Sequence, residues 1–140
     1  MINKFLSLLM MAHIVVNAAY IKEENDSETV ILDTKTNLIW QDFNVVDQSW
    51  KDAITYCEGL EVGIYKDWKL PNYVELYSLV DLTKAEPSMN DIFTQKVATS
   101  YWTSTINTPG YVWTIDFKTG GNKDNYSLET ELKTRCVHTR

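Results

Sequence analysis

The sequence has few of the side chains on which most enzymes and metal sites depend. Its 140 residues include two cysteines and two histidines, and His138 is the single histidine after residue 19. Structural zinc sites take four cysteine or histidine ligands, and Ser–His or Cys–His nucleophiles require an oriented histidine. None of the 19 acidic residues has a spacing that indicates a glycosidase pair. We therefore assign no catalytic residue, no metal and no cofactor.

Basic residues are also scarce. The chain has 13 basic and 19 acidic residues, a formal charge of −6, and residues 20–140 alone carry −7. This balance repels phosphate backbones and anionic membrane surfaces. Nucleic acid is therefore not an expected partner, and neither is a sulfated polyanion.

Long hydrophobic runs are missing apart from residues 5–16. Lys4 precedes this run and Ala18 and Ala19 follow it, which is the layout of a cleavable signal peptide. The run is too short to span a bilayer, which takes roughly 20 apolar residues. We expect residues 1–19 to be removed after Ala18 or Ala19, with no permanent membrane anchor and a periplasmic or extracellular location. The alternative is a buried N-terminal helix.

The chain after the signal peptide has the length of one domain. Residues 20–29 are polar and predict a flexible N-terminal segment before a domain over residues 30–140. Residues 30–33 and 38–41 are short apolar runs around a polar connection that ends at Asn37. This pattern predicts a β-hairpin with a left-handed residue near the end of its turn.

Two helices are expected in the first half of the domain. Ser49 lies three residues before Asp52, as at a capped helix N-terminus, and Gly63 ends the segment. Asn72, with Glu75 three residues later, starts the second helix. The helical spacing of apolar residues places these side chains on buried faces: Trp50, Ala53, Ile54, Cys57 and Leu60 in the first helix, and Val74, Leu76, Leu79 and Val80 in the second.

The last third of the chain changes to strand-like periodicity. Residues 101–105, 111–117 and 134–138 are rich in β-prone side chains, and the middle run alternates. One face of that run carries Tyr111, Trp113, Ile115 and Phe117. We predict an α+β domain whose two ends meet in one sheet. Residues 83–99 form a long connection of the kind that often carries function.

The order of these motifs resembles the bacterial domain of unknown function 1566, which also forms the C-terminal part of a Legionella collagen-like adhesin. The resemblance covers residues 30–138. It is carried by Ile31-Leu32-Asp33, Thr36-Asn37-Leu38-Ile39-Trp40-Gln41, Trp50-Lys51-Asp52-Ala53, Tyr56-Cys57, Asp67-Trp68-Lys69-Leu70-Pro71, Glu75-Leu76, Ser78-Leu79-Val80-Asp81, Tyr101-Trp102-Thr103-Ser104-Thr105, Val112-Trp113-Thr114-Ile115-Asp116-Phe117 and Arg135-Cys136-Val137.

The resemblance implies a C-type-lectin-like fold related to formylglycine-generating proteins, with two helices packed on a small, mostly antiparallel sheet with long loops. It also implies that Cys57 and Cys136 pair. The related formylglycine-generating enzymes depend on additional active-site cysteines that this chain lacks. The adhesin domain is thought to bind sulfated glycosaminoglycans as a trimer, so the resemblance favours a binding or adhesion module.

Most of the motif residues are expected to be structural. The five tryptophans could stack on sugars, but a small domain with this many aromatic residues uses most of them in its core. Asp67 and Arg135 are expected to be charged groups satisfied inside the domain. The structural set is Trp40, Trp50, Asp67, Trp68, Leu70, Pro71, Trp102, Trp113 and Arg135.

A ligand site is expected in the loops. Residues 83–99 and 106–111 would together present a recognition face on a rigid scaffold. The candidate ligand-binding residues are Glu86, Asn90, Asp91, Asn107 and Tyr111. A glycan or a protein is the expected ligand. The alternatives are a small periplasmic hydrolase or modifying enzyme that uses carboxylates near these loops, and a structural component of the cell envelope.

Two cysteines in an exported chain predict one disulfide, and two buried free thiols are the alternative. The bond would close a loop of about 80 residues, for which chain entropy gives at most roughly 4–5 kcal/mol. Mass spectrometry of the exported protein before and after reduction tests it. We expect reduction to add the mass of two hydrogen atoms, and an unchanged mass would contradict the bond.

Overall fold

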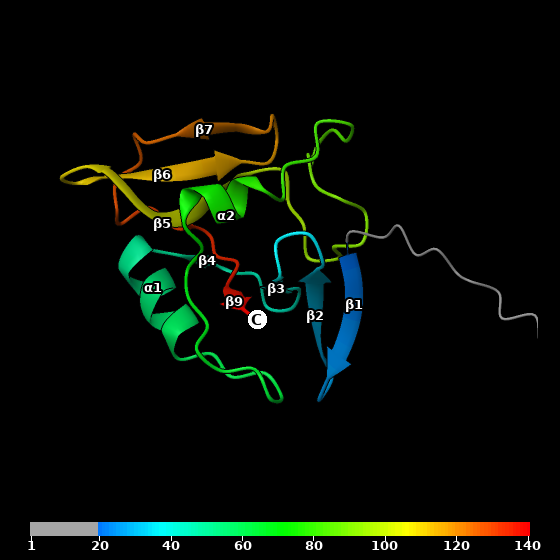
Figure 1. Cartoon of the computed structure of the whole chain (residues 1–140). Helices are drawn as coiled ribbons and strands as arrows, with labels where there is room; N and C mark the ends of the chain where they lie inside the picture. Colours follow the sequence, from blue (N-terminus) through cyan, green and yellow to red (C-terminus); the bar gives the residue numbers. More distant parts are fainter. Residues whose placement is uncertain (1–19) are drawn as a thin grey trace, which may run out of the picture.

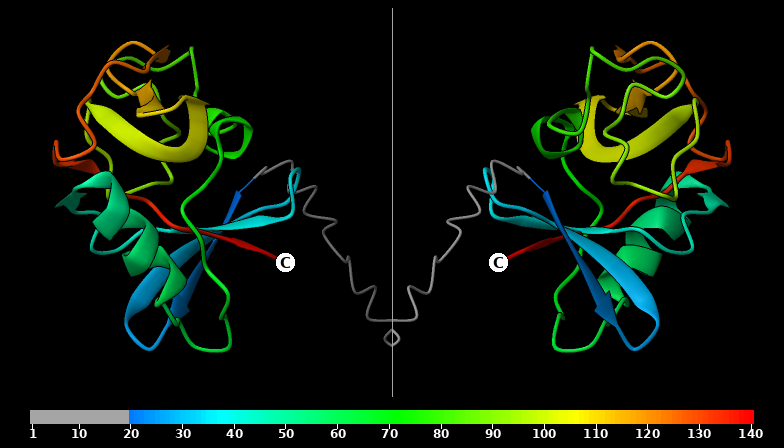
Figure 2. Two further views of the ribbon diagram at one scale, coloured as in Figure 1. Left: turned by 90° about the vertical axis from the view of Figure 1, so that its left-hand side faces the viewer. Right: turned by 90° about the vertical axis from the view of Figure 1, so that its right-hand side faces the viewer.

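The computed structural model describes residues 20–140, and the predicted signal peptide lies outside them. Two sheets form the molecule, one with the strand order β1-β2-β3-β9 and one with the order β4-β8-β5-β6-β7. Figure 1 labels the elements, and Figure 2 shows the first sheet at the bottom of the molecule and the second near the top. The α+β class is therefore correct, but two sheets take the place of the single small sheet that we expected.

The first sheet contains both ends of the described chain. Its strands are β1 (Tyr20–Asn25), β2 (Glu28–Asp33), β3 (Leu38–Gln41) and β9 (Val137–Thr139). All three pairings are antiparallel. The last strand joins β3, which confirms that the two ends of the domain meet in one sheet (Figure 1).

Strand β1 differs from the flexible segment expected over residues 20–29. It pairs with β2 along its whole length, from Tyr20 opposite Asp33 to Asn25 opposite Glu28. Its side chains are polar because β1 is an edge strand of the sheet, with one face toward solvent. Asp26 and Ser27 close the hairpin with φ angles of 49° and 72°, the left-handed backbone that tight hairpin turns require.

The hairpin of β2 and β3 forms as its sequence predicts. Oδ1 of Asp33 accepts hydrogen bonds from the backbone N–H groups of Lys35, at 2.9 Å, and Thr36, at 3.4 Å. Asn37 has a φ of 61°, and its N–H donates to the carbonyl oxygen of Asp33 at 2.9 Å. The turn is thus held by one carboxylate and one left-handed asparagine.

Both predicted helices are present, and both are shorter than expected. Helix α1 (Trp50–Glu58) begins at Ser49, whose side chain accepts from the N–H of Asp52, and is capped by Gly59 rather than ending at Gly63. Helix α2 (Tyr73–Tyr77) has a complete capping box between Asn72 and Glu75. Helix α2 has about one and a half turns, so few of its side chains can face the core. Leu76 is buried, but Val74 is 76% exposed rather than buried.

The second sheet is built around β5. Its strands are β4 (Asp47–Gln48), β8 (Leu132–Lys133), β5 (Ser100–Thr108), β6 (Tyr111–Asp116) and β7 (Gly121–Lys123). Strands β5 and β6 correspond to the β-prone runs predicted over residues 101–105 and 111–117, whereas β4, β7 and β8 are too short to leave a periodic signal. On β6 the expected face is buried at Ile115, but Tyr111 is 50% exposed and Val112, on the other face, is buried.

Two apolar clusters form the core. One surrounds the disulfide and includes Trp102 and Trp68, and the other includes Trp40 and Tyr101. Trp40 and Trp102 are fully buried and Trp68 nearly so, as are Leu70 and Pro71, whereas Trp50 and Trp113 are partly exposed.

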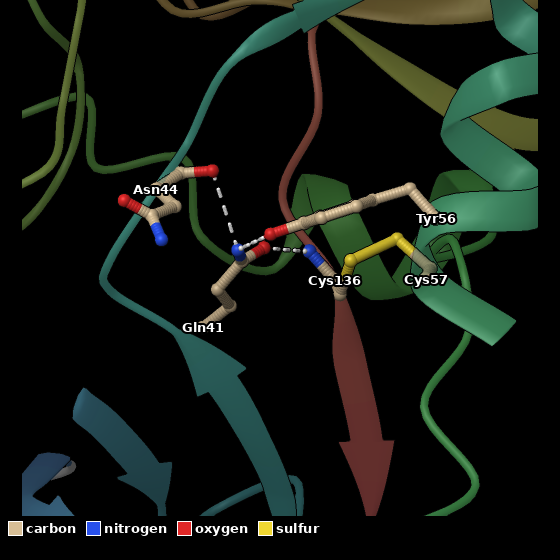
Figure 3. Close-up of a disulfide and its surroundings, with 5 residues drawn as sticks. All are labelled: Gln41, Asn44, Tyr56, Cys57 and Cys136. Carbon is tan, nitrogen blue, oxygen red and sulfur yellow. Dashed lines mark hydrogen bonds between the residues drawn. A yellow bond between two sulfur atoms is a disulfide. The ribbon is translucent and has the colours of Figure 1, made fainter. Parts of the chain in front are cut away.

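The disulfide between Cys57 and Cys136 joins α1 to the residue before β9, with a Cα–Cα distance of 5.4 Å. Figure 3 shows Gln41 beside it. Oε1 of Gln41 accepts from the N–H of Cys136, and Nε2 donates to the hydroxyl of Tyr56, each at 2.9 Å. The buried amide of Gln41 therefore fixes the chain on both sides of the disulfide.

Arg135 is fully buried, and its charge is balanced by Asp42 just after β3. Nη1 of Arg135 lies 3.3 Å from Oδ1 of Asp42, and the guanidinium also donates to the carbonyl oxygens of Gln41 and Gln95. The guanidinium lies over the ring of Phe93, 4.9 Å from its centre. Asp67 does not share this environment: it is exposed, with a φ of 58° in the turn before Trp68.

Asp42 also holds the long connection over residues 83–99. Its Oδ2 accepts from the N–H and the hydroxyl of Thr94, and its Oδ1 accepts from the N–H of Gln95 at 3.0 Å. One carboxylate therefore serves both the buried guanidinium and the long connection. Such a connection is ordered by specific polar contacts rather than by regular secondary structure.

We expect Asp42→Ala to lower the free energy of unfolding by roughly 3–5 kcal/mol, because it leaves the Arg135 guanidinium buried without its counter-charge. Urea unfolding of the disulfide-bonded protein measures this loss. Asp47→Ala is the matched control, since it breaks an ion pair with Lys133 in which Asp47 is 51% exposed, and we expect it to cost about 1 kcal/mol or less. Equal losses for the two variants would contradict the prediction.

Candidate functional site

A cleft of about 490 Å³ lies between the first sheet and the segment that follows α2. One wall consists of the start of β1 and the β2–β3 turn, and the other of the residues that follow α2, with one contribution from the long connection. The cleft is lined by Tyr20, Asp33, Lys35 and Thr36 on the first wall, by Ser78, Leu79, Val80, Asp81 and Leu82 on the second, and by Asn90.

The first wall is positioned by strand pairing. Tyr20 lies opposite Asp33 in the β1–β2 ladder, so both side chains belong to the same end of the sheet. The ring of Tyr20 packs edge-on against Phe93, with ring centres 5.5 Å apart. Asp33 is 3% exposed and ends β2 by accepting the turn amides.

The second wall is tied to the long connection and to the β6–β7 turn. Val80 forms a bridge with Met89, and the N–H of Asp81 donates to the carbonyl oxygen of Ser88 at 2.9 Å. Gly120 packs behind this wall with a φ of +78°, and a Cβ atom there would lie 2.8 Å from Leu82 and 3.0 Å from Val80. Gly120 therefore packs closely against Val80 and Leu82, and this wall has little space to shift away from the cleft.

Two carboxylates set the electrostatics of the cleft. Burial, followed by the charges of Asp33 and Asp81, raises the pKa of Tyr20 to about 12, so its hydroxyl keeps its proton at neutral pH. Hydrogen bonds from the hydroxyl and N–H of Thr83 lower the pKa of Asp81, and the nearby charge of Lys84 adds to this effect. The cleft thus offers a phenol donor close to an ionised carboxylate.

Few positive charges reach these carboxylates. The amine of Lys84 lies 2.7 Å from a carboxylate oxygen of Asp91, and that of Lys96 lies 2.8 Å from the other oxygen. None of the ion pairs within residues 20–140 involves Asp33, Asp81 or Lys35. Lys35 is the one basic residue in the lining.

The five residues expected to bind a ligand do not come together. Asn90 alone lines the cleft, where its Oδ1 accepts from the N–H of Ile92 at 2.9 Å. Asp91 is exposed and engaged with the two lysines, which hold its pKa at about 2. Glu86 is exposed, with a φ of 48° before a cis peptide bond to Pro87. The side-chain oxygens of Asn90 and Asp91 thus accept hydrogen bonds from groups within residues 83–99 themselves.

Asn107 and Tyr111 lie at the other end of β5. The amide of Asn107 donates to Asp124 at 2.7 Å, and Tyr111 is exposed at the tip of the β5–β6 hairpin. Residues 83–99 enter β5 at Ser100, whereas the hairpin tip follows Thr108 (Figure 1). Six residues of β5, 100–105, separate the two ranges, and six strand residues span roughly 20 Å. Residues 83–99 and 106–111 therefore adjoin opposite ends of β5 rather than forming the single recognition face that we expected.

The described residues contain no group of three or more histidine, cysteine, aspartate or glutamate side chains placed to hold a metal ion.

A second surface combines Tyr73 and Tyr77 of α2 with Trp113 of β6. The ring of Tyr73 is 5.8 Å from each of the other two ring centres. Asn122 donates to the hydroxyl of Tyr73 at 3.0 Å. These rings mainly pack on one another.

Reasoning from the sequence missed Tyr20, Asp33 and Asp81 as site residues. Asp33 and Asp81 lie in motifs that carry the family resemblance, and Tyr20 lies in the segment predicted to be flexible. The signal that could have found Tyr20 is the polar hairpin turn at Asp26 and Ser27, which predicts an additional strand before β2.

We expect the phenol of Tyr20 to titrate near pH 12. Ultraviolet difference absorbance should lose its last alkaline step in Tyr20→Phe, and in Asp81→Asn that step should move to lower pH because one repelling charge is removed. The folded state holds this proton more tightly than the unfolded chain, so the stabilising contribution is complete below pH 10 and is lost as the pH rises from 10 to 12. Identical titration curves for wild type and Tyr20→Phe would contradict this assignment.

Comparison with protein families gives one finding. The model of the Lcl C-terminal domain matches residues 29–138, from β2 to β9. The match includes every cleft residue except Tyr20. A comparison with curated proteins gave no match.

Proposed function

This chain belongs to the Lcl C-terminal domain family, and from that premise we propose that it is an exported, non-enzymatic binding module that recognises a glycan in its cleft. The cleft carries the proposal. Four segments of the chain bring a phenol, two carboxylates, two hydroxyls and an amide to one concave surface with apolar residues beside them. A concave site with a few convergent polar groups is typical of ligand pockets.

The size of the cleft favours a compact ligand. A volume of about 490 Å³ lies within the range of roughly 300–1,000 Å³ that small-molecule sites have. A protein partner would instead need a surface of about 800 Å² on each side. One or two sugar units of a glycan fit the cleft, and a protein ligand is the second candidate.

The scaffold supports recognition rather than catalysis. The Cys57–Cys136 disulfide links α1 to the residue before β9, and the buried Arg135–Asp42 pair links the end of β3 to the long connection that carries Asn90. Asp33 and Asp81 could suggest a carboxylate-dependent hydrolase, but a general acid needs a raised pKa, and that of Asp81 is lowered. The hydrolase therefore has weaker support than a binding module.

The proposal includes export and a C-type-lectin-like fold. A disulfide suits an oxidising compartment such as the periplasm or the cell surface, and residues 1–19 have the layout of a signal peptide. Two short helices, two sheets and joined terminal strands support the lectin-like fold. Within residues 20–140 no helix has the length and apolar character that spanning a membrane requires.

A glycan array probed with purified residues 20–140 tests the function. We expect binding to a restricted set of glycans, weakened about tenfold or more in Asp81→Asn, because a hydrogen bond to a charged group contributes roughly 1.5–3 kcal/mol. Tyr111→Ala, at the far end of β5, is the control and should bind as wild type does. A blank array, or binding lost in Tyr111→Ala and kept in Asp81→Asn, would contradict a glycan site in the cleft.

A further inference from the structure

We infer that the cleft selects a sugar that carries a free primary ammonium group, of the hexosamine class, over its N-acetylated and sulfated forms. This inference rests on the proposed function and adds the charge of the ligand to it. The selection depends on how the carboxylates of Asp33 and Asp81 are compensated.

Asp33 is a buried carboxylate that forms no ion pair within residues 20–140. Its side chain is 3% exposed, and its Oδ1 accepts from the N–H groups of Lys35 and Thr36. A buried charge is costly unless an opposite charge or several hydrogen bonds compensate it. The amides supply part of that compensation, and no ion pair within residues 20–140 supplies the rest. A cationic ligand would supply the opposite charge that residues 20–140 do not pair with Asp33.

Asp81 faces the same space from the opposite wall. Asp33, Asp81 and Tyr20 line the same cleft, and after burial the charges of the two carboxylates contribute to the raised pKa of the Tyr20 hydroxyl. The nearest lysine of the long connection, Lys84, is held by Asp91 at 2.7 Å. Lys35 is exposed and makes no ion pair with either carboxylate. The described lining thus contains two carboxylate side chains and one lysine.

The remaining lining suits a sugar frame. Thr36 offers a hydroxyl and Asn90 an amide nitrogen that can bind sugar hydroxyls, and the Ser78 hydroxyl, which donates to the carbonyl oxygen of Glu75 at 2.6 Å, can still accept. Leu82, which is 73% exposed, offers apolar surface for the C–H face of a ring. An N-acetyl group would remove the positive charge of the sugar. A sulfate would place a second anion beside Asp33 and Asp81, and like charges at close range repel strongly when they are partly buried.

Isothermal titration with three matched disaccharides tests the inference: glucosamine disaccharide at a pH where its amines are protonated, its N-acetylated form, and a sulfated glucosamine disaccharide. We expect the ammonium form to bind at least about tenfold more tightly than the N-acetylated form, and the sulfated form to bind least. Asp81→Asn should remove most of this preference, and Asp124→Asn, near Asn107 at the far end of β5, should keep it.

Lys35→Gln gives a gain rather than a loss. It removes the basic residue of the described lining at an exposed position, so we expect tighter binding of the ammonium form and a smaller gain for the N-acetylated form. The urea midpoint of each variant checks that the fold is intact.

The outcomes separate the two proposals. Equal or tighter binding of the N-acetylated form, still weakened by Asp81→Asn, overturns the ammonium preference and leaves the glycan site. Binding of none of the sugars, with a blank glycan array, overturns both.

Discussion

The buried ion pair between Arg135 and Asp42 fixes three segments that are distant in the sequence. Asp42 follows β3, Arg135 precedes β9, and the carboxylate also anchors residues 94 and 95 of the long connection. Their neighbours Gln41 and Cys136 add a buried amide and the disulfide to α1. The guanidinium lies over Phe93, whose ring in turn meets Tyr20 in the cleft. The rings of Phe93 and Tyr20 therefore connect the buried ion pair to the proposed binding site by direct packing.

The parts of the fold that follow from short-range chemistry could be predicted from the sequence. Asn37 marks a left-handed turn residue, and Ser49 and Asn72 mark helix starts, because each of these residues bonds to backbone within three or four positions. Predicting the disulfide needed only the count of cysteines and the predicted signal peptide, since two cysteines permit one pairing. The long β5–β6 hairpin left a clear pattern of β-prone residues.

The cleft could not be predicted in this way, because it depends on contacts between segments far apart in the chain. β1 is polar as an edge strand, so its composition resembles that of a loop. Asp67 and Arg135 both stand in shared motifs, yet one is exposed and the other fully buried. Residues 83–99 and 106–111 are close in sequence, and residues 100–105 of β5 place them at opposite ends of that strand. Sequence proximity was a poor guide to spatial proximity here.

Because the first and last strands lie in the same sheet, the fold is suited to circular permutation. Tyr20, Asp33, Leu38 and Thr139 lie in successive register across the first sheet, so three strand spacings of about 4.8 Å separate Tyr20 from Thr139 by roughly 14 Å. A linker of about five residues can bridge that gap. New ends could open at Gly110, where a Cβ atom would meet nothing within 4 Å beyond its chain neighbours among the described residues. In such a rearranged protein an affinity tag or a surface attachment would sit at the hairpin tip, away from the cleft.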